Sequence, residues 1–208
     1  TMQYQVTVLD VTPPAFTLAA TASKNASSTS CYYTTVGAEF DPSDITDNCT
    51  SANYTIINNY NNYKSLEYAQ FPVGTTNVQW SVKDNYGNEL LKTIAVTVTD
   101  NVKPVISCPG SSYTRVVDQG QSYYTIGSGE FKPVATDNCS FTYTHDFTPS
   151  SSNTSLTGEH LTVGTHNITW SAADAAGNQE FCTVTIEVVN DLYPSITCVG
   201  DQSKNNTI

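Results

Sequence analysis

The chain has 208 residues, a net charge of −11 at pH 7 and only 8 Lys and Arg residues. This composition lacks the basic surface with which proteins bind nucleic acid or anionic membranes. No apolar run is long enough to cross a bilayer, so no membrane insertion is expected of this segment.

The sequence matches itself after a shift of 90 residues, as from Trp80 to Trp170 and from Asn48-Cys49 to Asn138-Cys139. A fixed period of this length predicts tandem domains, in a segment of a longer array. The predicted segments are 1–10 as the last strand of a preceding repeat or a donor strand for a neighbouring molecule, 11–101 and 102–191 as two domains, and 192–208 as the start of a third repeat.

Apolar residues alternate with polar ones near the end of each repeat. Residues 78–82 and 93–99 follow this pattern in the first repeat, and 183–188 follow it in the second. Such alternation is typical of half-buried strands in an antiparallel sheet. The turns between these strands, at 84–88 and 174–178, contain Gly and Asn, which accept the positive φ of tight turns. The sequence therefore predicts an all-β fold, with tandem immunoglobulin-like antiparallel β-sandwiches of about 90 residues each.

The order of motifs in the second repeat resembles the hyalin repeat family. The motifs are Pro-x-Ile-x-Cys at 104–108, Asp-Asn-Cys at 137–139, Val-Gly-Thr at 163–165, Trp170, Asp-x-x-Gly-Asn at 174–178, and Cys182 followed by an alternating strand. The resemblance implies an immunoglobulin-like sandwich that recurs in extracellular adhesion proteins, and it does not imply an enzyme. The first repeat departs from the pattern, because Leu18 and Lys92 stand where two cysteines would be.

The missing cysteines suggest how the others pair. The first repeat lacks the counterparts of both Cys108 and Cys182, so we expect these two cysteines to bond to each other. The first repeat is then left with Cys31 and Cys49 as its own pair, and the family pattern supports both pairings. Disulfides of this density indicate a secreted or surface protein.

Cys139 and Cys198 have no assigned partner. Ser122 stands near the position of Cys31 in the second repeat, and the partner of Cys198 would lie beyond residue 208. Connectivity does not follow from sequence alone. The alternatives are Cys108–Cys139 with Cys182–Cys198, a cross-link between chains, a buried free thiol, or another partner within the chain.

Seven Asn-x-Ser/Thr sites are candidates for N-glycosylation, although a chain so rich in Ser, Thr and Asn contains several such triplets by chance. Asn167 is favoured because it faces away from Ile168 and Trp170, and two of the sites precede cysteines. The sites are Asn25, Asn53, Asn153, Asn167 and Asn205, with Asn48 and Asn138 as weaker candidates.

Aspartates stand at the predicted joints between repeats, at Asp10, Asp100 and Asp191. A structural calcium ion is one interpretation, since calcium binds carboxylate oxygens. Turn formation at the end of a strand is the other. One or two acids at each joint supply few of the six to eight oxygens that calcium needs.

Nothing in the sequence indicates catalysis. The three histidines, His145, His160 and His166, all lie in the second repeat and have no counterpart in the first. A Ser-His-Asp set could be chosen from any Ser-rich chain, so it carries no catalytic signal. The main hypothesis is a structural segment of a glycosylated extracellular fibre or cell-surface stalk, with further copies of the repeat as partners. The alternative is an adhesion module that binds a cell-surface glycan or protein through loops 54–63 and 141–158.

Overall fold

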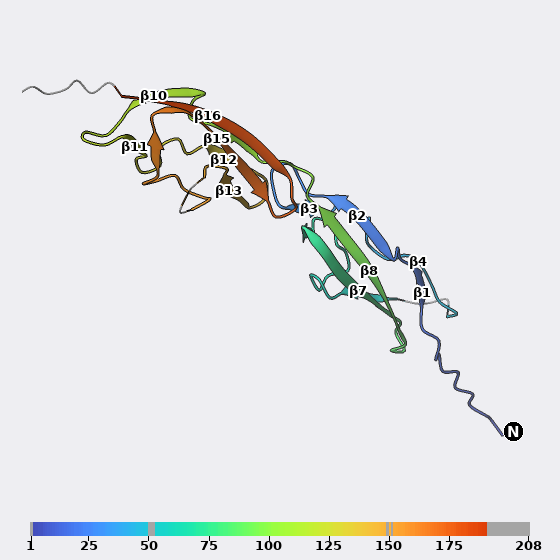
Figure 1. Ribbon diagram of the computed structural model, residues 1–208. Helices are drawn as coiled ribbons and strands as arrows, with labels where there is room; N and C mark the ends of the chain where they lie inside the picture. The colour runs from blue at the N-terminus through green and yellow to red at the C-terminus, as the bar shows by residue number, and fades with distance from the viewer. Residues whose placement is uncertain (1, 50–52, 149, 151, 191–208) are drawn as a thin grey trace, which may run out of the picture. The chain divides into compact units, whose positions relative to one another are not determined.

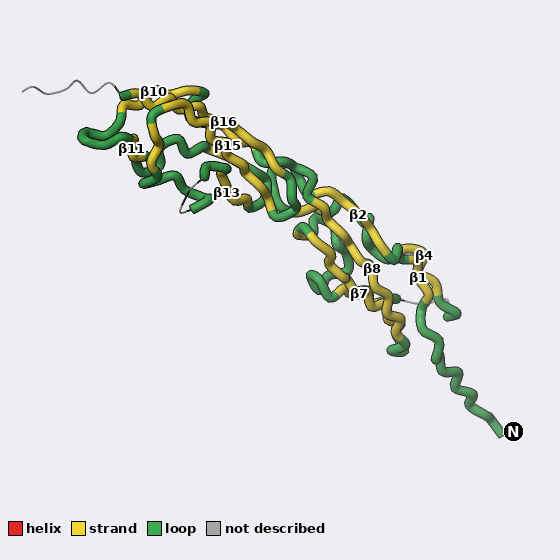
Figure 2. The backbone as a smooth tube through the Cα atoms, viewed as in Figure 1, coloured by secondary structure: helices red, strands yellow, loops and turns green. Residues whose placement is uncertain are grey.

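A computed structural model describes residues 2–49, 53–148, 150 and 152–190 (Figure 1). These residues form strands and loops without a helix, which confirms the predicted all-β class (Figure 2). None of them forms a helix long and apolar enough to cross a membrane. The strands are β1 (Ala15–Thr17), β2 (Thr21–Asn25), β3 (Tyr32–Thr34), β4 (Ser43–Thr46), β5 (Thr55–Asn58), β6 (Gln70–Pro72), β7 (Gly74–Lys83), β8 (Glu89–Thr99), β9 (Val105–Ser107), β10 (Ser112–Val116), β11 (Tyr123–Thr125), β12 (Val134–Thr136), β13 (Phe141–His145), β14 (His160–Thr162), β15 (Gly164–Asp174) and β16 (Gln179–Val189).

The chain divides into two compact units. Unit 1 contains the described residues up to Pro104 together with two later segments, Thr136–Phe141 and Ala173–Gln179. Unit 2 contains Val105–Ala135, Thr142–Ala172 and the described residues from Glu180 on. Two loops of the second sequence repeat therefore belong to unit 1 by their contacts.

The first eight strands build a sheet in the order β2-β8-β7-β5 and two strand pairs, β1-β4 and β3-β6. The hairpin β7–β8 is antiparallel, and its inward residues Val78, Trp80 and Ile94 are fully buried. Phe16 of β1 and Phe71 of β6 belong to the same core. The alternating pattern of the sequence thus places one face of each long strand in the core of the sandwich.

The second eight strands repeat this arrangement with the sheet order β10-β16-β15-β13 and the pairs β9-β12 and β11-β14. Its core contains Ile168 and Trp170 of β15 with Val184, Ile186 and Val188 of β16. Both four-stranded sheets differ from the expectation in one respect. β2 pairs in parallel with β8, and β10 with β16, so the sheets are mixed. Parallel partners need a long connection, which leaves no turn signal in the sequence.

A polar network recurs in both repeats. Its equivalent residues are 91 positions apart in the sequence, whereas the motifs compared above are 90 positions apart. In unit 2, the Arg115 guanidinium contacts Glu130 Oε1 through Nη2 (2.7 Å) and Nε (2.8 Å). Tyr124 Oη donates to Glu130 Oε2 at 2.6 Å. In unit 1, Lys24 and Tyr33 contact Glu39 in the same way. One extra residue in the second repeat before β10 accounts for the changed shift.

The network holds the pKa of Glu130 below its ordinary value of 4.5. Partial burial alone would raise this pKa. Hydrogen bonds from Tyr124, from the Gly127 N–H and from Arg115 outweigh the burial. Because the folded-state pKa is depressed, the carboxylate stabilises the fold at neutral pH. That contribution is lost as the pH falls below about 4.5.

We expect Glu130→Gln to lower the free energy of unfolding at pH 7 by about 1–2 kcal/mol, because charge-assisted hydrogen bonds are replaced by neutral ones. Urea unfolding at pH 7 and pH 3 measures this change, and the deficit should shrink at pH 3. Glu187→Gln, which removes the same charge from an exposed position, is the control. An equal effect of both variants, or an unchanged deficit at pH 3, would contradict the assigned role.

Candidate functional site

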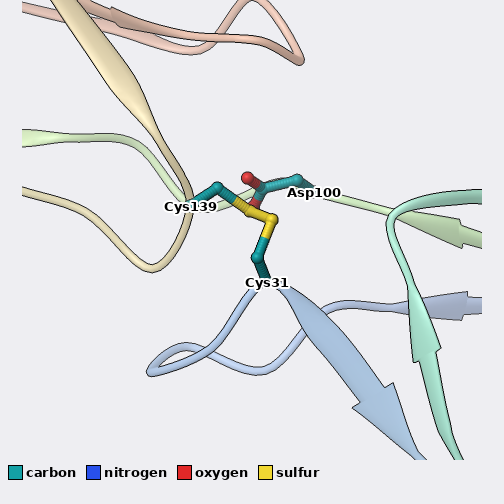
Figure 3. A group of neighbouring side chains, drawn as sticks. All are labelled: Cys31, Asp100 and Cys139. Atoms are coloured by element: carbon teal, nitrogen blue, oxygen red, sulfur yellow. A yellow bond between two sulfur atoms is a disulfide. The ribbon is translucent and has the colours of Figure 1, made fainter.

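The candidate site is the group of loops in unit 1 that carries the repeated Asp-Asn-Cys motif. Cys139 of the second motif is bonded to Cys31, 108 positions earlier in the sequence (Figure 3). Asp100 lies beside this disulfide, with its carboxylate close to the two sulfurs (Figure 3). Residues 31, 100 and 139 all belong to unit 1.

This bond corrects the expected Cys31–Cys49 pair. Cys31 takes Cys139, and Cys49 is the free thiol among the described cysteines. The local pairing fails because the loop 136–141 packs within unit 1 and brings a cysteine from far along the chain to Cys31. Cys139 is therefore not left over, whereas Cys198 lies outside the described residues. A second disulfide joins Cys108 to Cys182, as their joint absence from the first repeat suggests.

Each Asp-Asn-Cys motif is held by the same turn. The Cys49 N–H donates to Asp47 Oδ1 at 2.9 Å, and the Cys139 N–H donates to Asp137 Oδ1 at 2.8 Å. Such Asx turns let an aspartate fix the backbone two residues further on. The asparagine between them is also used, because Asn138 Nδ2 donates to the carbonyl of Ser27 (3.0 Å).

A second repeated contact joins the hairpin turns to the residues that precede β1 and β9. Asn88 Nδ2 donates to Asp84 Oδ2 (2.7 Å) and to the Asp10 carbonyl (3.2 Å). In the next repeat, Asn178 Nδ2 donates to Asp174 Oδ2 (2.7 Å) and to the Asp100 carbonyl (3.1 Å). These contacts hold Asp10 against the hairpin turn 84–88 and Asp100 against the hairpin turn 174–178.

The result is two acidic clusters. The second acidic cluster is Asp100, Asp137 and Asp174, in which one carboxylate oxygen of each residue lies within 4.8 Å of the others. Asp100 is 4% exposed and Asp174 is 9% exposed. Asn138 Nδ2 donates to Asp100 Oδ1 at 3.2 Å, which fixes the Asn138 amide against this cluster.

The first acidic cluster is Asp10, Asp47 and Cys49, with the same 4.8 Å limit between ligand atoms. Asn48 is oriented so that Nδ2 donates to Asp10 Oδ1 (3.3 Å) and Asp47 Oδ1 (2.9 Å). A hydrogen bond to Asp10 is the main cause that raises the pKa of the Cys49 thiol, followed by burial and nearby carboxylates. The pKa of Asp10 is lowered, first by the hydrogen bond from the Thr12 N–H.

The structure therefore brings two of the three expected metal residues, Asp10 and Asp100, into acidic clusters. The third, Asp191, lies outside the described residues. Sequence reasoning missed Asp47 and Asp137 as members. Their signal was present, because Asp-Asn-Cys is retained at both positions under the 90-residue shift.

The glycosylation candidates differ in accessibility. Asn138 is a poor acceptor in the folded protein, because its Nδ2 is hydrogen-bonded and its Oδ1 is buried. Asn205 lies outside the described residues. The five exposed candidates are Asn25, Asn48, Asn53, Asn153 and Asn167.

The histidines do not form a catalytic group with one another. The His145 ring packs against Trp170, with 4.9 Å between ring centroids. His160 stacks on Tyr123, and His166 contacts the carbonyl of Thr162. Each ring is thus occupied by a separate local contact.

Both repeats carry a shallow hollow on the outer face of the four-stranded sheet, next to loops 54–63 and 141–158. The hollow in unit 1 has a volume of about 310 Å³, and its lining includes Asn59, Gln79 and Leu91. The hollow in unit 2 has a volume of about 290 Å³, and its lining includes His145 and Phe181. Gln79 and Leu91 correspond to Thr169 and Phe181 under the repeat shift, so the two hollows are equivalent.

Comparison with known proteins identifies relatives of this chain. The family model of the HYR domain matches residues 99–188. Hyalin of Lytechinus variegatus is 32% identical over 137 residues, and hyalin of Strongylocentrotus purpuratus is 35% identical over 123 residues. These alignments cover 63% and 57% of this chain but only 24% and 9% of the two hyalins. The chain therefore spans about a quarter or less of the relatives that it matches.

Solved structures of cadherin repeats share a low similarity with the chain. The EC1-2 fragment of human protocadherin-24 has a TM-score of 0.34 at 15% identity, over 87% of this chain and 99% of the fragment. The EC1-2 fragment of human mucin-like protocadherin has a TM-score of 0.36 at 12% identity, over 85% of this chain and 98% of the fragment.

The raised pKa of the Cys49 thiol predicts slow alkylation near neutral pH, because the thiolate is the reactive form. Asp10→Asn removes the carboxylate that accepts the thiol hydrogen bond, so the pKa should fall and iodoacetamide should react faster at pH 7.5. Mass spectrometry of timed samples measures the rate. Asp44→Asn is the control, because it removes a carboxylate from β4, just before the loop of Cys49, that does not contribute to the raised pKa. This variant should leave the rate unchanged. An alkylation rate that Asp10→Asn does not alter would contradict the assigned hydrogen bond between Cys49 and Asp10.

Proposed function

Residues 99–188 match the family model of the HYR domain, and from this premise we propose that the chain is a structural segment of an extracellular fibre or cell-surface stalk. The family match and the curated relatives support an adhesion-type module located outside the cell or at its surface. The mechanical role and the partners, further copies of the same repeat, belong to the proposal. So does the absence of catalysis, since HYR domains are typically non-enzymatic.

The observation that carries the proposal is the way in which the two disulfides interlock. The loop closed by Cys31–Cys139 overlaps in sequence with the loop closed by Cys108–Cys182. Three segments of the chain therefore connect one disulfide to the other. These segments run from 31 to 108, from 108 to 139 and from 139 to 182. The shortest has 31 residues, which limits the separation of the two pairs to about 110 Å even if every strand unfolds.

Such a limit is suited to a protein that is pulled from its ends. A tandem array transmits tension along the chain, and unfolding of one sandwich would otherwise release its whole length. The interlocked bonds keep most of that length out of the tensioned path. An active site or a small-molecule site gains nothing from this arrangement.

Glycosylation fits the same role. Asn167 lies on the exposed side of β15, opposite the buried Ile168 and Trp170. Its Oδ1 accepts a hydrogen bond from Thr185 Oγ1 (2.8 Å), and its Nδ2 is the atom that would carry a glycan. A sugar there would cover a sheet face without disturbing the core.

The two equivalent hollows favour ligand binding as a second candidate function. His145 is 9% exposed, neither ring nitrogen has a hydrogen-bond partner, and the residue lines the hollow beside the exposed Phe181. An aromatic ring next to polar groups suits a glycan or a protein loop. The sequence of the whole parent protein distinguishes the roles. Many near-identical repeats favour a fibre, and a distinct terminal domain favours an adhesin whose stalk this segment forms.

We expect a reducing agent to lengthen the fully unfolded protein by about 400 Å in single-molecule pulling, because 151 residues (31 to 182) then replace 31 residues (108 to 139) in the tensioned path. The contour length of the unfolded chain, measured before and after reduction, tests this value.

Two variants serve as matched controls. Cys108→Ser with Cys182→Ser leaves a path of 43 residues (139 to 182), which is about 40 Å longer than in the intact protein. Cys31→Ser with Cys139→Ser leaves 77 residues (31 to 108), which is about 160 Å longer. Reduction that changes the contour length by much less than 400 Å would exclude the interlocked arrangement, and with it the proposed mechanical role.

Glycosylation is tested in a eukaryotic secretory host. We expect Asn167→Gln to remove the mass of one N-glycan, because this site is exposed, and Asn138→Gln to leave the glycan mass unchanged. Intact-mass measurement before and after enzymatic removal of N-glycans gives both results. A denatured protein whose mass equals that of the bare polypeptide would refute the glycosylated form of the proposal.

A further inference from the structure

We propose that the turn 66–69 of unit 1 is a docking surface for a positively charged segment of another protein, with Tyr68 as its anchor. The turn connects the loop after β5 to strand β6, and all of its residues belong to unit 1. The proposal is independent of the mechanical role above, because no disulfide takes part in it.

Tyr68 has a backbone conformation that suits glycine. Its φ is 61°, and it is the third residue of a turn in which the Ala69 N–H donates to the Leu66 carbonyl (2.9 Å). A positive φ at this position of a turn favours Gly or Asn, and a bulky side chain there is an outlier. Such conformations cost stability and are concentrated at functional sites.

The second repeat forms the same turn without this strain. In the turn 156–159, Gly158 stands in the place of Tyr68 and has a φ of 83°. The backbone contacts are also the same. The Tyr68 N–H donates to the Thr35 carbonyl (3.3 Å), and the Gly158 N–H donates to the Ile126 carbonyl (2.9 Å). The sandwich therefore needs this turn but does not need a tyrosine in it.

The side chain that carries the strain does not serve the core either. Tyr68 is 74% exposed, and Val36 on the neighbouring segment is 75% exposed. Both residues flank the last backbone hydrogen bond that continues the β3–β6 ladder. Gly127 and Gly158 stand at the two equivalent positions of the second repeat. Unit 1 thus presents an aromatic and an apolar side chain to solvent at a place where unit 2 presents backbone.

The groups beside Tyr68 select a cationic partner. Glu67 precedes it, is exposed, and takes part in no ion pair within the described part of the chain, whereas the second repeat has Thr157 at this position. Among the described residues the Tyr68 ring has no lysine over it, unlike Tyr33, whose ring centroid lies 5.1 Å from Lys24 Nζ.

An arginine or lysine of another protein can contact the face of the Tyr68 ring and the Glu67 carboxylate together. The net charge of −11 attracts such a segment from a distance. The same charge disfavours a second copy of this chain as the partner, because like charges across an interface repel.

The test is an NMR titration of the whole ¹⁵N-labelled chain with an octa-arginine peptide, and an octa-glutamate peptide is the charge-reversed control. We expect the largest amide shifts at Val36 and in the turn 66–69, and none with octa-glutamate. Tyr68→Gly should weaken binding about three- to tenfold, because the ring that contacts the cation is lost. Glu67→Gln should weaken it about twofold or more.

Tyr63→Gly is the matched control, because Tyr63 is 72% exposed in the same unit and is not among the residues with a positive φ. It should leave peptide binding unchanged. Urea unfolding separates the two sites further. Tyr68→Gly should raise the unfolding midpoint by relieving the strain, whereas Tyr63→Gly should lower it because glycine gives the unfolded chain more freedom.

Three results would each overturn the proposal. They are amide shifts that spread over the acidic surface without a maximum at the turn, peptide binding that Tyr68→Gly leaves intact, and a midpoint that falls as far with Tyr68→Gly as with Tyr63→Gly. None of them bears on the contour length measured by pulling.

Discussion

The bond between Cys31 and Cys139 is the constraint on which the loops of unit 1 depend. It links the Asp-Asn-Cys loop of the second repeat to the first repeat within unit 1. In that position Asn138 reaches the Ser27 carbonyl and Asp100, and Asp137 joins two other aspartates.

The same bond separates the roles of two otherwise equivalent motifs. At Cys139 the sulfur is consumed in a disulfide, and the cluster around it is made of oxygens alone. At Cys49 the sulfur stays a thiol, and its hydrogen bond to Asp10 raises its pKa. One tripeptide thus gives a cross-linking site in one repeat and a free thiol with a raised pKa in the other. The difference arises because Cys31 is bonded to Cys139 and so is not available to Cys49.

Much of the fold could be predicted from the sequence, because its signals are local. The alternation around Trp80 and Trp170 and the Gly-Asn turns after them correctly indicated the β7–β8 and β15–β16 hairpins and their buried faces. The parallel pairing of β2 with β8 could not be foreseen, because its partners are about 70 residues apart and share no turn.

Cys31 was assigned to Cys49 for a related reason. Proximity in sequence was the only guide, whereas the true partner is brought close by packing. Asp10 and Asp100 were recognised by position, but the cluster members from other segments required three-dimensional contacts.

The central claim is that Cys31 is bonded to Cys139, and disulfide mapping without reduction tests it most directly. Free thiols are blocked with N-ethylmaleimide in denaturant, and the chain is then cut with trypsin and a Glu-specific protease. Cleavage after Glu39 separates Cys31 (peptide 25–39) from Cys49 (peptide 40–64), and cleavage after Glu130 and Glu159 isolates Cys139 in peptide 131–159. The account predicts that peptide 25–39 is linked to peptide 131–159 and that peptide 40–64 carries one N-ethylmaleimide group, on Cys49. A disulfide that links peptide 25–39 to peptide 40–64 would contradict it.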